Sequence, residues 1–280
     1  MPEPPPAQRR VLVTGGTGNL GSHVVAALEE RGAIARVLSR RARPQNAPEQ
    51  REWAEADLLL GELEPALRDV DAVVHLASEK GAGDADVVGT RRLLAAIERA
   101  GTRHLVVVSI IGCDRIPLPF YETKQRIEQE VRAGRAPWSL VRVAQFHSFV
   151  ERLVATAGTL PVPAPIVSDL RFQPVDEREV ADALVEIALG PPLGEAPEIA
   201  GPELLTLGEI AATWVSVTGR TATMAPVSVA TLLGEPGGVL QPAHWVGPVL
   251  EGYRAAWNTP HAARTLGRIS FADWLRRRQR

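Results

Sequence analysis

The glycine-rich segment Thr14–Gly21, with the sequence T-G-G-T-G-N-L-G, constrains the fold of this chain more than any other feature. It follows the apolar run Val11–Val13 and precedes apolar residues at helical spacing. Glycines between a strand and a helix are typical of a turn that holds a dinucleotide pyrophosphate against unpaired N–H groups of the helix. Gly15 would permit the tight turn, Gly18 would let the phosphates approach, and Gly21 would let the helix pack closely on the strand.

Strand-like and helix-like patterns alternate along the first half of the chain. Short β-branched runs predict strands at residues 11–13, 33–38, 52–56, 71–76, 104–109 and 138–143. Apolar residues at helical spacing predict helices between them, at residues 20–31, 60–67, about 90–101 and 121–132. Continuous apolar strands that alternate with helices are typical of a parallel sheet covered on both faces. We therefore expect an α/β fold with a doubly wound parallel sheet of the Rossmann type.

The pattern becomes irregular after about residue 147. Prolines predict a loop at residues 160–165, and glycines with prolines predict another at 234–242. We expect three parts: a disordered leader, a dinucleotide-binding core, and the remaining core elements with a small irregular substrate lobe, at residues 1–9, 10–150 and 151–280.

Two residue pairs fit the capping box that opens a helix, Asp176 with Glu179 and Thr206 with Glu209. They predict helices at residues 177–189 and 207–218, and a last short helix is expected at 270–277. The arginine-rich end of that helix is expected to be solvated, because basic residues suit the C-terminal end of a helix dipole.

Composition excludes several classes of protein. The chain is 45% hydrophobic and 23% charged, as folded globular proteins are, and its net charge of −2 gives no reason to expect nucleic acid or an anionic membrane as a partner. No run approaches the ~18 apolar residues of a transmembrane helix, and the first residues lack the apolar stretch of a signal peptide. The single cysteine, Cys113, excludes an internal disulfide and is expected to be inert and half-buried. No grouping has metal-ligand spacing, and we expect a cytoplasmic protein without a metal.

The end of the second predicted strand indicates which dinucleotide is bound. An NAD ribose calls for an acidic residue there, but the strand ends Leu38-Ser39-Arg40-Arg41. A guanidinium such as that of Arg40 suits a 2′-phosphate through charge-assisted hydrogen bonds, so NADP(H) is the expected cofactor. Asp57, after the third strand, either accepts a hydrogen bond from the adenine amino group or only opens a helix.

Several of these segments together resemble the short-chain dehydrogenase/reductase superfamily: T-G-x-x-G-x-x-G, the strand end His75-Leu76-Ala77-Ser78, Ser109 and Lys124. The chain is more closely similar to the atypical, NmrA-like branch of NAD(P)-binding proteins. Segments at residues 88–94, 140–146, 173–176 and 271–275 carry that closer resemblance.

The resemblance implies roles for individual residues. Arg40 would lie near the 2′-phosphate, Ala77 would line the adenine-ribose side, Ser109 would stand beside the nicotinamide, and Lys124 would bond the nicotinamide ribose. The full set expected to contact the cofactor is Gly15, Thr17, Gly18, Asn19, Leu20, Gly21, Arg40, Asp57, Ala77 and Lys124.

The expected active site departs from the family pattern at one position. Typical members carry Tyr-x-x-x-Lys, with the tyrosine as general acid or base, but the residue four before Lys124 is Phe120. Tyr121 is adjacent, and on an ideal helix its direction differs from the usual one by roughly 100°. Tyr121 is therefore either a displaced acid or a helix-surface or packing residue.

Three further residues are candidates for the catalytic site. Lys124 is one of only two lysines in the chain, and a flexible ammonium suits two ribose hydroxyls better than a guanidinium does. Ser109 binds a substrate carbonyl or the nicotinamide amide, or bonds only the backbone. His147 follows the sixth strand and is either a proton donor or structural, and His75 is expected in the core. The other lysine, Lys80, is expected at the surface.

Two functional hypotheses follow. The first is an NADP(H)-dependent reductase of a small apolar carbonyl, enone or quinone, since charge delocalised over such a substrate lowers the need for a tyrosine acid. The second is a regulatory NADP(H) sensor that performs no chemistry and acts on a protein partner, as some NmrA-like proteins do, and Phe120 supports it. A sugar-nucleotide epimerase is a third and weaker hypothesis, because it needs the missing tyrosine.

Overall fold

The computed structural model of the chain describes residues 8–78, 83–158, 164–220, 224–234, 246–261 and 264–279. The chain divides into two compact units, each assembled from separate segments of the sequence. The first unit comprises Met1–Val108, Gln125–Val141 and Arg178–Ala196, and the second comprises Ser109–Lys124, Arg142–Glu177 and Pro197–Arg280. The expected division at residue 150 is sequential, and it stays a prediction beside this interleaved arrangement.

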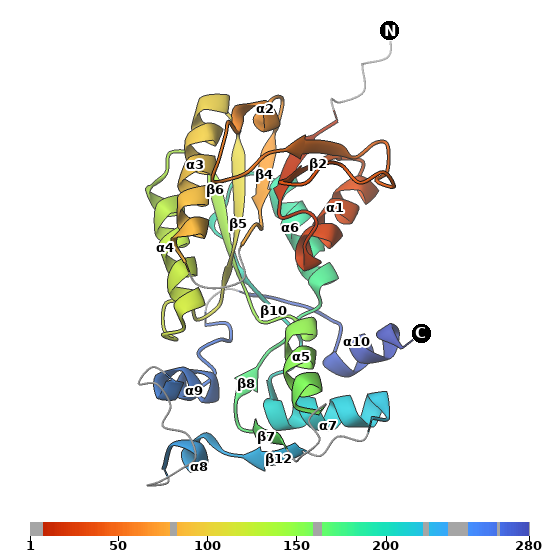
Figure 1. Cartoon of the computed structure of the whole chain (residues 1–280), viewed down its shortest axis with the longest axis vertical. Coiled ribbons are helices and arrows are strands. Elements are labelled where there is room, and N and C mark those ends of the chain that lie inside the picture. The colour runs from red at the N-terminus through yellow and green to blue at the C-terminus, as the bar shows by residue number, and fades with distance from the viewer. Residues whose placement is uncertain are drawn as a thin grey trace. The chain divides into compact units, whose positions relative to one another are not determined.

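The central sheet follows the strand order β13-β10-β6-β5-β4-β1-β2-β3, with β9 paired to β6 (Figure 1). β1 lies between β2 and β4 and is parallel to both. The predicted doubly wound parallel sheet is confirmed. Its strands are β1 Arg10–Thr14, β2 Ile34–Ser39, β3 Glu52–Glu55, β4 Ala72–His75, β5 His104–Ile110, β6 Trp138–Val143, β9 Gly194–Glu195, β10 Glu198–Ala200 and β13 Arg264–Leu266.

Helices cover both faces of the strands of the first unit (Figure 1). On one face, Leu93 and Ile127 belong to a buried cluster with Val73 and Leu105 of the sheet. On the other face, Arg31 after the first helix forms an ion pair at 2.9 Å with Asp182. The first face carries α2 Glu64–Leu67, α3 Asp84–Ala100 and α4 Pro119–Ala133, and the second carries α1 Asn19–Glu30 and α6 Glu177–Leu189.

The predicted helix at residues 60–67 is wrong over its first half, because α2 begins only at Glu64. Gly61 has a φ of +75°, a left-handed conformation that interrupts a right-handed helix. Pro65 lies within the first turn of α2, where a helix tolerates it. The helix predicted from the spacing of apolar residues therefore does not form there, because the conformation of one glycine interrupts it.

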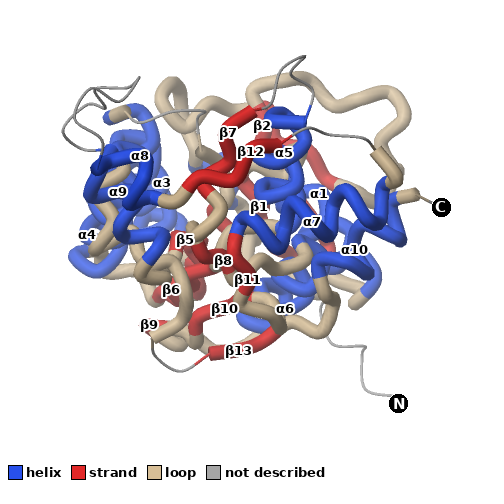
Figure 2. Tube along the Cα trace, turned by 90° about the horizontal axis from the view of Figure 1, so that it is seen from below, coloured by secondary structure: helices blue, strands red, loops and turns tan. Residues whose placement is uncertain are grey.

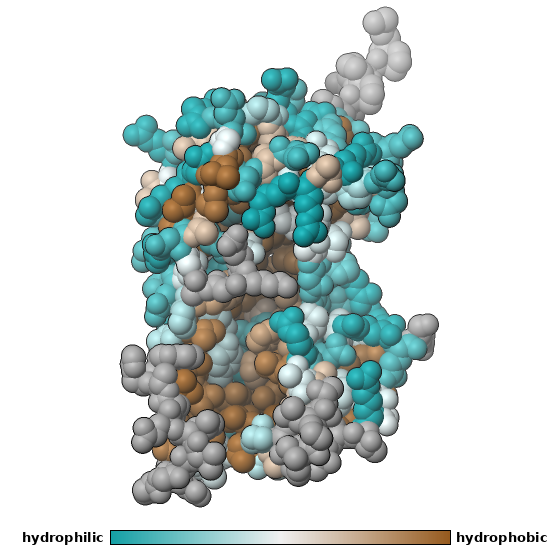
Figure 3. All heavy atoms as spheres, in the orientation of Figure 1, coloured by the Kyte–Doolittle hydropathy of each residue, from teal (hydrophilic) through white to brown (hydrophobic). Residues whose placement is uncertain are grey.

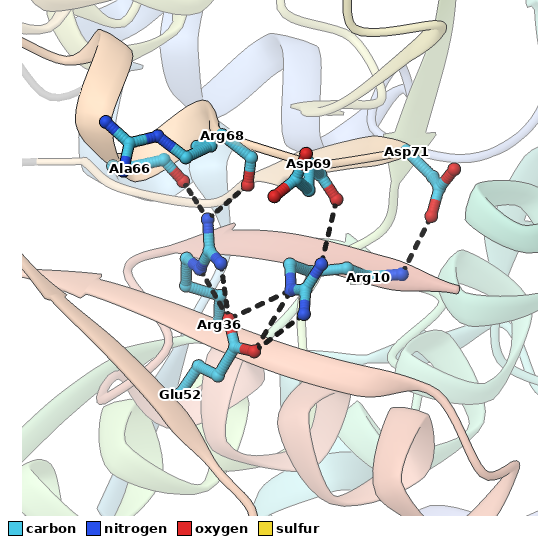
Figure 4. A network of polar contacts seen from close by, with 7 residues as sticks. All are labelled: Arg10, Arg36, Glu52, Ala66, Arg68, Asp69 and Asp71. Carbon is cyan, nitrogen blue, oxygen red and sulfur yellow. Dashed lines mark hydrogen bonds and ion pairs between the residues drawn. The ribbon is translucent and has the colours of Figure 1, made fainter. Parts of the chain in front are cut away.

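A network of charged residues joins the beginnings of three strands in the first unit (Figure 4). The carboxylate of Glu52 on β3 accepts from Arg10 on β1 at 3.0 Å and from Arg36 on β2 at 2.7 Å. Arg36 also donates to the carbonyls of Ala66 and Arg68, at 2.9 Å and 2.7 Å. Burial acts to raise the pKa of Glu52, but the two guanidiniums outweigh it and hold that pKa below 4.5. Glu52 therefore acts as a carboxylate, and its bonds to the two arginines fix β3 to the sheet.

The second unit contains shorter elements. α7 contacts both α5 and α10, and the parallel pair β7–β12 contacts α5 and α7 through β7 (Figure 2). The predicted capping box is confirmed at α7, where Glu209 N donates to Thr206 Oγ1 and Thr206 N donates to Glu209. The elements are α5 His147–Gly158, β7 Ala164–Val167, β8 Arg171–Phe172, β11 Leu205–Thr206, α7 Leu207–Thr218, β12 Met224–Val227, α8 Val229–Gly234, α9 Val246–Arg254 and α10 Phe271–Arg278.

The loop predicted at residues 160–165 is wrong at its end, because Ala164 and Pro165 belong to strand β7. Among the described residues β7 pairs with β12 alone, so its other edge is open, and an edge strand tolerates a proline, which has no N–H to donate. Residues 160–163 and most of the loop predicted at 234–242 lie outside the described residues. The predicted helices at 177–189, 207–218 and 270–277 are confirmed within one residue.

On the face shown in Figure 3, hydrophobic side chains gather among the elements of the second unit, in the lower part of the picture. Large apolar side chains of that unit that are more than a third exposed are Leu153, Leu204, Leu233, Trp257 and Leu266. No helix in the part of the chain that the structure describes has the length and hydrophobicity needed to cross a bilayer.

Candidate functional site

A pocket opens in the first unit where strands β1, β2 and β4 end. Parallel strands place their carboxyl ends at one edge, which is where doubly wound sheets bind ligands. The pocket is lined by Gly15, Thr17, Gly18, Leu38, Ser39, Arg40, Arg41, Ala56, Asp57, Leu58, Leu59, His75, Leu76, Ala77, Ser78, Ala85, Asp86 and Gly89. Six residues predicted to contact the cofactor are therefore together in one pocket, while Asn19, Leu20 and Gly21 lie in the first turn of α1.

The glycine turn has the conformation that its sequence predicts. Gly15 has a φ of +69°, and a Cβ there would lie 2.8 Å from the backbone nitrogen of Ala77. A Cβ on Gly21 would lie 2.1 Å from the carbonyl oxygen of Gly15, so the helix meets the turn at a distance that only glycine allows. α1 begins after Gly18 without a side-chain cap. Gly18 lines the pocket, so the N-terminal end of the α1 dipole, which favours an anion, lies beside it.

A chain of buried hydrogen bonds fixes the floor of the pocket. Thr14 Oγ1 accepts from the N–H groups of Leu76 and Ala77, both at 3.2 Å, so its own proton goes to His75 Nδ1 at 2.7 Å. Thr90 Oγ1 donates to the carbonyl of Asp86 at 2.7 Å and therefore accepts from His75 Nε2 at 3.1 Å. His75 was predicted only as a core residue. The directions of these bonds assign a proton to His75 Nε2 and an acceptor to Nδ1, and the ring connects β1, β4 and α3.

The end of β2 forms a basic corner of the pocket. Arg40 and Arg41 both line it, whereas the sequence analysis selected Arg40 alone. Arg41 is held by its N–H, which donates to Ser39 Oγ at 3.0 Å, and by its carbonyl, which accepts from Trp53 Nε1 at 2.8 Å. Asp57 lines the pocket as well, and its Oδ1 accepts from the N–H of Leu59 at 2.8 Å. The backbone bond shows that Asp57 caps a turn, and contact with adenine stays a prediction.

The predicted catalytic residues all belong to the second unit. Lys124 is buried, with Nζ 5.4 Å from the ring centroid of Phe120, the residue predicted to stand in place of the family tyrosine. This cation–π contact places the lysine and the phenylalanine on one side of α4. Ser109 is buried within β5, and its Oγ lies 3.6 Å from Sγ of Cys113. Cys113 is fully buried, not half-buried as expected. Lys80 lies outside the described residues.

Tyr121 belongs to a buried apolar cluster, so it is a packing residue and not a helix-surface residue, and its role as a displaced acid stays a prediction. It is 3% exposed, and its hydroxyl lies 2.7 Å from the hydroxyl of Tyr253 and accepts from Gln145 Nε2 at 2.8 Å. Burial raises the pKa of Tyr121 well above its ordinary value of 10, Tyr253 adds to the rise, and the bond from Gln145 opposes it. Burial also raises the pKa of Tyr253, and there the bond from Tyr121 opposes the rise.

The same cluster extends to a residue near the C-terminus. Asn258 Nδ2 donates to Gln145 Oε1 at 2.8 Å and to the carbonyl of Arg171 at 2.9 Å. Among the described residues, Asn258 Oδ1 is buried and accepts no hydrogen bond. Sequence reasoning missed Tyr253 and Asn258, because nothing in their local pattern marks them. One clue was available, since Tyr121 and Tyr253 are the only two tyrosines of the chain.

His147 is the first residue of α5 and is buried. Its Nε2 donates to the carbonyl of Ile269 at 3.0 Å, since a carbonyl only accepts. The ring lies 5.7 Å from that of Phe271 and 5.6 Å from that of Trp274. These contacts support the structural interpretation of His147, and its role as a proton donor stays a prediction.

Comparison with known proteins places these features in context. Residues 7–240 match the family model described as the NmrA-like family. A (4-alkanoyl-5-oxo-2,5-dihydrofuran-3-yl)methyl phosphate reductase of Streptomyces griseus is 31% identical over 217 residues, covering 75% of this chain and 74% of that protein. The photosystem II assembly factor Ycf39 of Trieres chinensis is 29% identical over 150 residues, covering 49% of this chain and 46% of that protein.

Among solved structures, the fold is similar to that of the NADPH-dependent quinone oxidoreductase QOR2 of Escherichia coli, determined with NADPH. The TM-score is 0.75 at 19% identity, over 96% of this chain and 100% of that one. The UDP-glucose 4-epimerase of Thermus thermophilus, determined with NAD, gives a TM-score of 0.66 at 19% identity, over 95% and 96% of the two chains. At this level of identity the similarity concerns the fold alone.

Proposed function

Because the chain belongs to the NmrA-like family, we propose that it is an NADP(H)-dependent reductase of a small apolar carbonyl, enone or quinone. The observation that carries this proposal is the pocket of the first unit, where the glycine turn meets Arg40 and Arg41. The relative from Streptomyces griseus is itself named as a reductase, which supports the class of reaction. We expect it to act in the cytoplasm, in keeping with Cys113 as its single cysteine.

The residues of the pocket fit a dinucleotide with a 2′-phosphate. A pyrophosphate needs close backbone approach and the positive end of a helix dipole, which the turn at Gly15 and Gly18 and the start of α1 supply. Two guanidiniums at the end of β2 suit the extra phosphate of NADP(H), and the strand carries no acidic residue there to bind the ribose hydroxyl of NAD. When bound, the cofactor supplies a hydride, and the protein supplies its placement and electrostatics.

Four further residues are proposed to act at the nicotinamide. Lys124 is proposed to bond the nicotinamide ribose, and Ser109 to bond the carbonyl of the substrate or of the nicotinamide amide. Tyr121 and His147 are the candidate proton donors. Phe120 carries no proton, so an apolar quinone or enone, which spreads negative charge over several atoms, is the substrate class that this set of residues suits best.

The first experiment measures cofactor binding by the increase in NADPH fluorescence. We expect NADPH to bind at least about tenfold more tightly than NADH, and the Arg40→Ala/Arg41→Ala double variant to lose that preference by weakening NADPH alone. Arg43→Ala is the matched control, because Arg43 follows the same strand end but does not line the pocket. Equal affinities for NADPH and NADH in the unmodified protein would contradict the assignment to NADP(H).

The second experiment measures chemistry. Stopped-flow oxidation of NADPH is followed with a panel of quinones, enones and ketones, and we expect turnover with at least one apolar member. Tight NADPH binding without turnover of any of them would sink the proposal of a reductase.

One observation favours a second candidate, a non-catalytic NADP(H) sensor that regulates a protein partner. Phe120 replaces the family tyrosine, and one relative is named as an assembly factor. A sensor must bind NADP⁺ and NADPH with different affinities and must associate differently with its partner in the two states. Calorimetry with both forms tests this requirement, and equal affinities would exclude the sensor.

A further inference from the structure

The two tyrosines of the chain form a pair within the second unit. Tyr121 lies in the first turns of α4 and Tyr253 lies in α9, and their hydroxyl oxygens are 2.7 Å apart. Their rings are 6.5 Å apart at an angle of 50°, so the hydroxyls and not the ring faces make the contact. The surroundings are apolar: Phe172 lies 5.2 Å from the ring of Tyr253, and Ile116 and Val249 belong to the same cluster.

The direction of every hydrogen bond leading to this pair is fixed by one backbone carbonyl. The carbonyl of Arg171 can only accept, so the nitrogen of the Asn258 amide faces it. That same nitrogen donates to Gln145 Oε1, and Gln145 must therefore present Nε2 to Tyr121. Tyr121 accordingly accepts a hydrogen bond from Gln145.

Among the described residues, one of the two hydroxyl hydrogens of the tyrosine pair has no hydrogen-bond acceptor and is called the uncommitted proton. The pair carries two O–H groups, and only one proton lies between the two oxygens. The other proton has no acceptor within the part of the chain that the structure describes. A buried polar hydrogen without a partner is destabilising, so binding of an acceptor by the pair is favourable.

A head-to-tail arrangement of the hydrogen bonds leaves the uncommitted proton on Tyr253. In a head-to-tail chain each hydroxyl accepts one bond and donates the next, and such chains polarise one another favourably. The order is then Asn258 to Gln145 to Tyr121 to Tyr253. Tyr253 is also the more accessible of the two, at 8% exposed against 3% for Tyr121.

We propose that Tyr253 donates its hydroxyl hydrogen to the carbonyl or quinone oxygen of the substrate, and that Tyr121, Gln145 and Asn258 are positioning residues which orient it. This inference rests on the proposed reductase function. It gives the protein a proton source outside the Tyr-x-x-x-Lys position that Phe120 occupies. An apolar molecule with one acceptor oxygen suits the pair, because the unmet hydrogen bond at the two hydroxyls is a donor among apolar side chains, whereas the unmet oxygen of the same cluster belongs to Asn258 and is an acceptor.

The proton and electrons balance in the reduction. The carbonyl carbon of a ketone, or the conjugated system of an enone or quinone, gains a hydride from NADPH, leaving NADP⁺. The displaced π-electron pair moves to the carbonyl oxygen, and that oxygen takes the proton of Tyr253. The phenolate left at Tyr253 is stabilised by the O–H of Tyr121, whose oxygen in turn accepts from Gln145. A water molecule then returns the proton to Tyr253.

The test uses the whole protein with NADP⁺ and menadione, a dead-end mixture that binds without turnover. Infrared difference spectra of carbonyl-labelled menadione report the hydrogen bond, because a donor lowers the C=O stretching frequency. We expect a lowered frequency in the unmodified protein, its loss in Tyr253→Phe, and a smaller lowering in Tyr121→Phe. With NADPH present, Tyr253→Phe should reduce kcat about 100-fold or more and Tyr121→Phe about tenfold.

Phe149→Leu is the matched control, since Phe149 packs against the same apolar cluster and the ring contact that the structure shows for it is with Arg152, not with the tyrosine pair. It should leave the frequency unchanged and kcat within about twofold. A Tyr253→Phe variant that keeps both kcat and the carbonyl frequency of the unmodified protein overturns the proposal while leaving the reductase function intact. If no quinone, enone or ketone is reduced and menadione does not bind, both proposals fail together.

A second measurement covers the case in which Tyr253→Phe does not fold. Protein grown with fluorotyrosine carries two fluorine probes, one in each tyrosine, because the chain has no others. The Tyr121→Phe variant assigns the two NMR signals. We expect the Tyr253 signal to move more than the Tyr121 signal when menadione is added, and the reverse order would overturn the assignment of Tyr253 as the donor.

Discussion

The two units of this protein carry polar sites that are built in different ways. In the first unit, the pocket depends largely on backbone: the glycine turn at Gly15, the start of α1, and N–H groups fixed through Thr14. In the second unit, the polar cluster consists of side chains from distant parts of the sequence, namely Tyr121, Gln145 and Tyr253, with Asn258.

The difference teaches what each site is sensitive to. A backbone site fails when a side chain is added where only glycine fits, and it has few groups that change charge. A site made of hydroxyls and amides tolerates small steric changes but depends on which atom carries each proton. The first site is therefore expected to respond to glycine substitutions, and the second to pH and to the loss of single polar atoms.

Gly21→Ala should have the largest effect, since its Cβ would lie 2.1 Å from the carbonyl oxygen of Gly15. We expect the affinity for NADPH, measured by fluorescence titration, to fall about 100-fold or more. Gly83→Ala is the control, because a Cβ on Gly83 meets nothing within 4 Å. A Gly21→Ala protein with unchanged affinity would break the idea that backbone approach defines the first site.

Gly201→Ala applies the same steric change to the second unit. A Cβ there would lie 1.7 Å from the carbonyl oxygen of Pro174, so the backbone must move. We expect the free energy of unfolding to fall by about 3 kcal/mol, measured by denaturant titration. Gly247→Ala is the control, since its Cβ makes only ordinary contacts, at 3.8 Å from Leu233. A loss as small as that of the control would show that the segment after β10 relaxes freely.

The tyrosine pair predicts a loss of stability in alkali. Because the folded-state pKa values of Tyr121 and Tyr253 are raised above 10, the folded protein keeps protons that the unfolded chain releases. The pair's contribution is complete below pH 10 and declines as the pH rises beyond it. The fall in melting temperature from about pH 9 to about pH 11 should be larger for the unmodified protein than for the Tyr121→Phe/Tyr253→Phe double variant. Equal falls would show that the pair does not set the pH dependence.

Glu52→Gln should give the smallest effect. Glu52 is also an exception to the comparison of the two units, because it is a titratable side chain in the first unit. Removing its charge from between Arg10 and Arg36 should lower the free energy of unfolding by about 1 kcal/mol at neutral pH. Since the folded-state pKa of Glu52 is below 4.5, the difference should shrink as the pH falls through that range. Glu55→Gln, a change at an exposed residue of the same strand, is the control. An equal loss of unfolding free energy in Glu55→Gln would show that the network does not stabilise the fold.

Prediction from sequence succeeded where the physical demand is local. The conformation of Gly15, the close packing at Gly21 and the capping box of Thr206 with Glu209 each involve few neighbouring residues, and the structure confirms them. The prediction failed at residues 60–63 for a related reason, because helical periodicity there gave too little weight to Gly61.

The remaining errors have a different cause. Pro165 belongs to a strand only because β12, almost sixty residues later, pairs with it. Tyr121 is buried only because Tyr253 and Gln145 meet its hydroxyl. Neither contact has any trace in the neighbouring sequence. The charge pattern of the sequence predicted a basic corner at the end of β2 but selected only its first arginine. Arg41 was missed, because the backbone bonds that hold it are visible only in the fold.

The hydrogen-bonded chain from Thr14 through His75 to Thr90 constrains which substitutions these three positions can accept in evolution. Thr90 does not line the pocket, yet it accepts the proton that fixes the tautomer of His75 and so the position of Ala77. A change at any one of the three leaves a buried donor or acceptor unmatched. We expect the three positions to covary among relatives, inherited as one unit across two strands and a helix.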